Sequence, residues 1–173
     1  MVLKLDSRHL QTIAAHAEST YPEECCGLLL GTIDPASGTT IVAVKSTENA
    51  WSADATHIGE SLNKTRRYEI APEVMLAAMR ESRDRNLAIV GIYHSHPDQP
   101  TVPSECDRQL AWRHYSYVIV SVAQGVTIEW HSWRLDANHQ FQPEEILMPC
   151  GTEERMRVGN GRSPQQPDPR YPI

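Results

Sequence analysis

The sequence has little cysteine, a deficit of positive charge and no long apolar run, and each shortage excludes a class of protein. Its four cysteines in 173 residues show neither C-x-x-C spacing nor the density of a disulfide framework. A net charge of −6 and a pI near 5.7 exclude an electrostatic case for binding nucleic acid or an anionic membrane surface. The apolar runs are strand-length, and the N-terminus lacks the pattern of a signal peptide. We therefore expect a cytoplasmic protein with reduced thiols and no membrane segment.

The length and composition suit one domain. A chain of 173 residues with 40% hydrophobic content is enough for one ordinary core. From Cys150 onward, proline, glycine, glutamine and mixed charge leave too little apolar surface to fold. We expect one domain over residues 1–149 and a disordered tail over residues 150–173.

Hydrophobic periodicity and turn residues predict alternating helices and strands. One helix is expected after Asp6 or Ser7, and another from Pro72 to about Asn86. The side chains of the second helix expected to face the sheet are Met75, Ala78 and Met79. Strands are expected over residues 25–32, 39–46, 87–93, 117–123, 126–135 and 140–148. The polar residues 49–67 are expected to form an insertion or flap.

The most informative stretch is residues 91–97, Gly-Ile-Tyr-His-Ser-His-Pro, at the end of an apolar run. Alternation along a strand puts His94 and His96 on one face and Ser95 on the other. Pro97 cannot continue a hydrogen-bonded ladder. We therefore expect the two imidazoles at a strand end, open to a cleft.

A second motif, Ser104-Glu-Cys-Asp107, follows after seven intervening residues. Ser104 suits a helix N-cap, which places Asp107 at the third helical position and near the strand end. Each motif alone has an ordinary explanation, as a surface strand or as a variant capping box. Together, two histidine nitrogens and a carboxylate oxygen match the three protein ligands of a catalytic zinc whose fourth position holds water.

These motifs resemble the zinc-binding motif of the JAMM family, the metallopeptidases of the MPN-positive (Mov34/PAD1) group. Residues 21–31, Tyr-Pro-Glu-Glu-Cys-Cys-Gly-Leu-Leu-Leu-Gly, resemble the family's upstream segment, in which a glutamate precedes an apolar strand. The resemblance covers roughly residues 7 to 135. It implies a cytidine-deaminase-like MPN domain of the α/β class, with a mixed, mainly antiparallel sheet flanked by helices. It also implies Zn²⁺ bound by His94, His96 and Asp107.

The mechanism also needs a base beside the metal, and the upstream segment offers two adjacent glutamates. In an extended segment only one of Glu23 and Glu24 can face the site, and chemistry alone does not choose between them. The resemblance assigns Glu24 as the base and leaves Glu23 as a solvated neighbour. By the same comparison Ser104 could donate to the oxyanion, worth about 2–4 kcal/mol if preorganised. The alternative is that Ser104 only caps the helix.

The resemblance implies hydrolysis of a peptide or isopeptide bond at the C-terminus of a ubiquitin-like protein. The short stretch between Asp107 and Tyr117 leaves no room for the long second insertion of linkage-specific deubiquitinases. We therefore favour a compact prokaryotic type that acts on a sulfur-carrier protein ending in Gly-Gly. The alternatives are a non-catalytic MPN scaffold, although such scaffolds lack the ligands, and a zinc amidase acting on an unrelated substrate. The oligomeric state is left open.

The remaining histidines lack the spacing of metal ligands. His9 and His16 share one face of the first helix but lie two turns apart, so we interpret both as solvated surface residues. His131 lies between Trp130 and Trp133, a pair that is expected to pack on the sheet.

Overall fold

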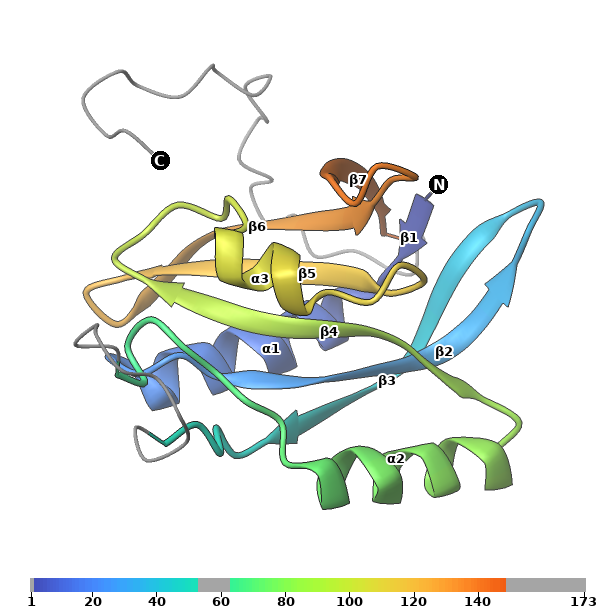
Figure 1. Cartoon of the computed structure of the whole chain (residues 1–173), viewed down its shortest axis with the longest axis horizontal. Coiled ribbons are helices and arrows are strands. Elements are labelled where there is room, and N and C mark those ends of the chain that lie inside the picture. Colours follow the sequence, from blue (N-terminus) through green and yellow to red (C-terminus); the bar gives the residue numbers. More distant parts are fainter. Residues whose placement is uncertain (1, 53–62, 149–173) are drawn as a thin grey trace.

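The computed structural model of the protein describes residues 2–52 and 63–148, and its strands close into a barrel (Figure 1). The strands are β1 Val2–Lys4, β2 Cys26–Asp34, β3 Gly38–Thr47, β4 Ala88–Pro97, β5 Ser116–Ala123, β6 Val126–Leu135 and β7 Phe141–Leu147. The helices are α1 Ser7–Thr20, α2 Pro72–Asp84 and α3 Glu105–Leu110. The expected tail and the centre of the expected insertion, residues 53–62, lie outside the described residues. No helix within the described ranges is long and apolar enough to cross a membrane.

The barrel runs in the order β1-β3-β2-β4-β5-β6-β7. Pairing is antiparallel for β3–β2–β4 and β5–β6–β7, and parallel for β4–β5 and for β1 with both β3 and β7. The mixed sheet with flanking helices is therefore confirmed. The sequence does not predict that the sheet closes, because the closing strand β1 has only three residues. Leu3 of β1 pairs with Thr39 of β3 and with Ile146 of β7. The likeness to cytidine deaminases stays a prediction.

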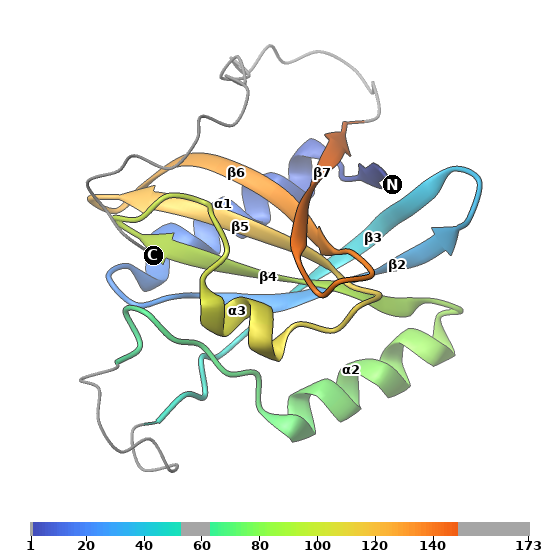
Figure 2. The ribbon, with the colours of Figure 1, turned by 45° about the horizontal axis from the view of Figure 1, so that its top comes forward.

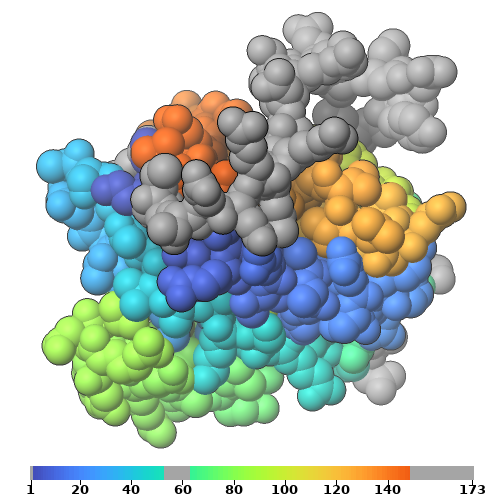
Figure 3. All heavy atoms as spheres, turned by 180° about the vertical axis from the view of Figure 1, so that it is seen from behind, coloured from blue at the N-terminus to red at the C-terminus, as the bar shows by residue number. Residues whose placement is uncertain are grey.

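Helix α1 begins and packs as its sequence predicts. The Asp6 carboxylate caps it by accepting a hydrogen bond of 2.8 Å from the backbone N–H of Arg8. Leu10, Ile13 and Ala17 are buried against the barrel. Seen from behind, α1 lies across one face of the molecule, between the N-terminal strands and β6 (Figure 3). Helix α1 therefore covers this face of the barrel.

Helix α2 packs on the other side, against β4 (Figure 2). Ala78 is fully buried, whereas Met79 is 41% exposed, so the prediction that Met79 faces the sheet is wrong. Ser82 lies on the buried face instead, one turn after Ala78, and its hydroxyl donates to the Ala78 carbonyl at 2.7 Å. The apolar pattern did not predict this burial, because it counts only apolar residues. A hydroxyl whose hydrogen bond is satisfied can also be buried at little cost.

Alternate residues of β4 enter two separate cores. Tyr93 packs into the core beneath α1, and Ile92 packs into the core on the side of α2. On the α1 side, His16 Nδ1 lies 2.9 Å from the Tyr93 hydroxyl, which donates to Ser46 Oγ at 2.8 Å. The interpretation of His16 as a solvated residue is therefore wrong. By the same alternation, His94 lies on the side of β4 that faces away from α1.

Candidate active site

Strand β4 places the two histidines between paired strands on both sides. His94 pairs with Cys26 of β2 and with Ile119 of β5. The ladder with β5 continues to Pro97, contrary to the expectation that proline ends it. Asp98 supplies the next N–H, which donates to the β5 carbonyl of Val122 at 2.8 Å. His94 and His96 are 0% and 8% exposed, so both imidazoles are buried in the sheet rather than open at a strand end.

Three side chains converge on one point beside this strand. His94 Nε2 lies 3.1 Å from His96 Nε2 and 3.4 Å from Asp107 Oδ1, and His96 Nε2 lies 3.7 Å from Asp107 Oδ2. A tetrahedral zinc with bonds of about 2.0–2.1 Å has ligand atoms about 3.3–3.4 Å apart. The three residues therefore fit a zinc ion, and they form a possible metal-binding group in the described part of the chain.

A backbone carbonyl fixes which nitrogen of His96 is free. His96 Nδ1 lies 2.7 Å from the Pro100 oxygen, which can only accept, so Nδ1 carries a hydrogen and Nε2 is the nitrogen left for a metal. Thr101 holds this loop to β6: its hydroxyl lies 2.6 Å from His131 Nδ1, and its carbonyl accepts from Trp133 Nε1 at 2.8 Å. This support could not be predicted from the sequence, because His131 and Trp133 lie about thirty positions after Thr101 and share no motif with it.

Two of the three candidate ligands, the neutral His94 and the ionised Asp107, have the charge that suits a cation, whereas the raised pKa of His96 means that this ring gives up a proton when a metal binds. Burial lowers the pKa of His94 to about 4, so its ring is neutral, and Tyr68 stacks on it with ring centroids 4.5 Å apart. Burial acts to lower the pKa of His96, but its hydrogen bonds and the Asp107 charge outweigh burial and raise it. Burial likewise acts to raise the pKa of Asp107, but the histidines and Ser104 hold it well below its usual value.

Ser104 and Asp107 form the predicted cap of α3. Ser104 Oγ accepts from the backbone N–H of Asp107 at 3.2 Å, while the backbone N–H and hydroxyl of Ser104 both donate to Asp107 Oδ2 at 2.6 Å. This capping box fixes the carboxylate and directs the serine hydroxyl hydrogen at it. An oxyanion role for Ser104 stays a prediction.

The structure separates the two glutamates. Glu24 is 7% exposed, whereas Glu23 points to solvent. Burial raises the pKa of Glu24 to about 8, against the opposing charge of His96. The next residue is tied to β4, since Cys25 N–H donates to Ser95 Oγ at 2.8 Å and Ser95 N–H donates to the Cys25 carbonyl at 3.1 Å. Glu24 is thus the buried one of the two glutamates, and the charges of His96 and Asp107 act on it.

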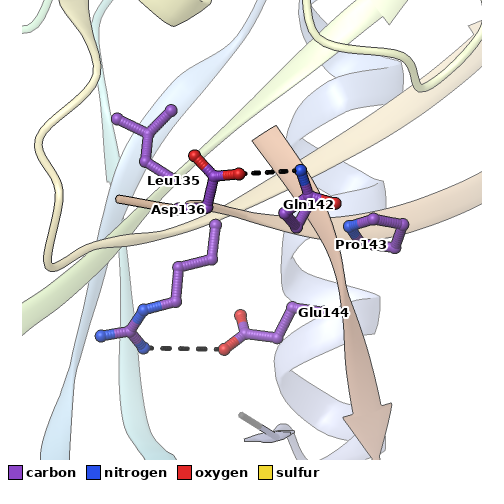
Figure 4. Close-up of a pocket in the computed structure, with 6 residues that line it drawn as sticks. Leu135, Asp136, Gln142, Pro143 and Glu144 are labelled. Carbon is purple, nitrogen blue, oxygen red and sulfur yellow. Dashed lines mark hydrogen bonds and ion pairs between the residues drawn. The ribbon is translucent and has the colours of Figure 1, made fainter. Parts of the chain in front are cut away.

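A separate cavity of about 140 Å³ lies between β6 and β7 (Figure 4). It is lined by Arg134, Leu135, Asp136, Gln142, Pro143 and Glu144. Arg134 of β6 pairs with Ser116 of β5, and Ser116 pairs with Gly91 of β4, which lies several residues before the two histidines. The cavity is therefore distinct from the candidate metal centre.

Together, the barrel with its helices and the buried His-His-Asp group define a class, a JAB/MPN-type domain with a candidate metal centre. The chain belongs to the family of prokaryotic homologs of the JAB domain, whose model matches residues 6–136. The resemblance drawn from the sequence is confirmed.

Relatives and a solved structure agree with this family. The chain is 31% identical to the desampylase of Haloferax volcanii over 116 residues, 66% of this chain and 73% of that protein. It is 31% identical to the desampylase of Pyrococcus furiosus over 91 residues, 53% of this chain and 63% of that protein. A solution structure of a Salinibacter ruber protein matches with a TM-score of 0.63 and 33% identity, covering 86% of this chain and 92% of that one.

Proposed function

We propose that this protein is a zinc-dependent metallopeptidase that hydrolyses a peptide or isopeptide bond at the C-terminus of a ubiquitin-like or sulfur-carrier protein. The observation that carries the proposal is the convergence of three ligand atoms beside a buried glutamate. The relatives add support, because two are named desampylases and that activity removes a ubiquitin-like modifier. We place the activity in one domain over residues 1–149 of a cytoplasmic protein.

His94, His96 and Asp107 would hold the metal. The Pro100 carbonyl and the Ser104 hydroxyl orient two of these ligands, so neither has to be reorganised on binding. When bound, zinc would supply a Lewis acid that polarises the scissile carbonyl and acidifies water.

Glu24 would move the protons. Its carboxylate would accept a proton from the attacking water and return it to the departing amine nitrogen. The buried setting suits this cycle, because it moves the pKa of Glu24 toward neutral pH, where the group can both take and give a proton. Ser104 would keep Asp107 in place and could also donate to the oxyanion by turning its hydroxyl.

Metal analysis and matched variants test the site. We expect about one zinc per chain, and loss of that zinc in His94→Ala. Glu24→Gln should keep zinc and lower kcat by at least about 10²-fold, while Glu23→Gln should leave kcat within about twofold. The reverse ranking of the two glutamates would overturn the assignment of the base.

Candidate ubiquitin-like and sulfur-carrier proteins with C-terminal extensions test the substrate, with cleavage followed by intact-mass spectrometry. Cleavage after the carrier's C-terminus by the zinc-loaded protein supports the proposal. Binding of a carrier without cleavage would indicate a scaffold instead. Zinc binding with neither binding nor cleavage of any carrier would overturn the carrier-protein substrate and leave an amidase acting on an unrelated substrate as the alternative.

A further inference from the structure

One buried amide side chain beside the site makes four hydrogen bonds, all to backbone groups. Asn49 follows β3 and is 8% exposed. Its Nδ2 donates to the carbonyls of Glu24 at 3.0 Å and Arg67 at 2.9 Å. Its Oδ1 accepts from the N–H groups of Trp51 and Glu69, each at 3.1 Å. Both halves of the amide are therefore fully used.

These bonds join Glu24 to the two chain segments on either side of residues 53–62. The Glu24 carbonyl is bound by Asn49, and the Glu24 N–H donates to the Lys64 carbonyl at 2.7 Å. A further hydrogen bond of 2.9 Å, from Ala50 N–H to the Glu69 carbonyl, joins the same two segments. Both peptide groups of Glu24 are thus satisfied by residues 49 and 64.

We propose that Asn49 is a positioning residue that fixes the backbone of Glu24 and couples it to residues 64–69. The proposal rests on the proposed role of Glu24 as the base. A buried side chain takes its direction from its backbone, and a displacement of about 1 Å of a catalytic group can cost about 10²-fold in rate. Asn49 therefore acts on catalysis through Glu24, without touching the reacting atoms.

The metal ligands are held by residues other than Asn49. The effect of Asn49 on the base can therefore be told apart from a general loss of stability. His96 is oriented by Pro100, and Asp107 is oriented by Ser104, so neither relies on Asn49. His94 touches residues 64–69 through its stacking on Tyr68, but its backbone is held by pairing with β2 and β5. A change at Asn49 should therefore disturb proton transfer and leave metal binding intact.

Asn49→Asp removes the donating half of the amide and keeps its size and its acceptor oxygen. We expect kcat to fall about 10²-fold, with KM and the zinc dissociation constant each within about twofold of wild type. The matched control is Ser132→Ala, which removes a buried hydrogen bond of 2.8 Å to Glu144 on β7, away from the site. The control should keep wild-type kcat.

A wild-type kcat per bound zinc in Asn49→Asp, measured well below its unfolding temperature, would refute the positioning role. An equal loss of kcat in Ser132→Ala would refute it as well, because that loss would follow stability. A parallel loss of zinc binding in Asn49→Asp alone would also count against it.

Amide hydrogen exchange in metal-free protein gives a readout that needs no substrate. In Asn49→Asp we expect the Glu24 amide, which donates to the Lys64 carbonyl, to exchange about tenfold faster, because the Glu24 backbone loses the hydrogen bond from Asn49 that helps to hold it against residues 64–69. The amides of Trp51 and Glu69 should stay protected there, because the carboxylate still accepts, and should lose protection in Asn49→Ala. Unchanged exchange at Glu24 in Asn49→Asp would refute the coupling. The exchange measurement tests the coupling even if no carrier protein is cleaved. Absence of cleavage would count against the proposed function alone.

Discussion

Replacement of Ser95 by alanine tests how β4 holds the segment that carries Glu24. Ser95 is 0% exposed, and its hydroxyl accepts the backbone N–H of Cys25 at 2.8 Å. Alanine removes this acceptor and leaves the Cys25 N–H buried without a partner. The hole left by one oxygen atom is smaller than the share of about 30 Å³ that a water needs, so no water replaces it.

The magnitude follows from the orphaned donor. A buried N–H left unsatisfied costs about 1–3 kcal/mol, so we expect Ser95→Ala to lower the free energy of unfolding by about 2 kcal/mol. With a urea m-value of about 2 kcal/mol/M, the unfolding midpoint falls by about 1 M. Tryptophan fluorescence of metal-free protein in urea measures this shift without a contribution from bound metal.

Ser82→Ala is the matched control. Ser82 is also buried, at 2% exposure, but its hydroxyl only donates to the Ala78 carbonyl, which keeps its helical hydrogen bond. This variant orphans no group and gains about 0.5 kcal/mol of helix propensity, so its midpoint should move by less than about 0.5 M. Equal midpoints for the Ser95 and Ser82 variants would refute the reasoning.

Two further variants probe the frame around the site. In Gly91→Ala the new Cβ would lie 2.3 Å from the Ser116 carbonyl oxygen, so β4 and β5 must separate. We expect urea unfolding to show a free energy of unfolding lower by about 2–3 kcal/mol. An unchanged midpoint would refute this contact. In Glu81→Gln the 2.7 Å ion pair with Lys45 is lost. That hydrogen bond lowers the pKa of Glu81 below 4.5, so the pair stabilises the fold above pH 4.5 and its contribution disappears as pH falls through the lowered pKa. The midpoint difference between wild type and Glu81→Gln should therefore shrink with acid, and a difference independent of pH would contradict it.

The three candidate ligands could be predicted from the sequence because each depends on a local rule. Strand alternation places His94 and His96 on one face, and the capping preference of Ser104 places Asp107 at the start of α3. Both rules operate over a few residues, and the structure follows both. The choice of Glu24 over Glu23 needed more, because alternation allows either one and only the resemblance or the observed burial distinguishes them.

Two supports around the site could not be predicted, because each joins residues that lie far apart in the sequence. Asn49 bonds to Glu24 across 25 positions, and His131 bonds to Thr101 across 30. Such contacts leave no periodic pattern in the sequence, and an asparagine in a polar run looks like an ordinary loop residue. The short strand that closes the barrel escaped prediction for a related reason, since three residues cannot show an alternation.

The site is therefore built as two halves that share β4 but have separate supports. In the metal half, Pro100 orients one ligand and the cap of α3 orients another, while in the base half Asn49 and Ser95 bind the carbonyl and the N–H of the peptide group that follows the glutamate. Tyr68 reaches both halves, since it stacks on His94 and lies between two residues that Asn49 binds. The other supports named here serve one half each, so damage to one half should leave the other working. A variant of Asn49 should bind zinc but turn over slowly, whereas a variant of His94 should lose zinc and keep the slow amide exchange of Glu24. Loss of both properties in either variant would show that the two halves are one unit.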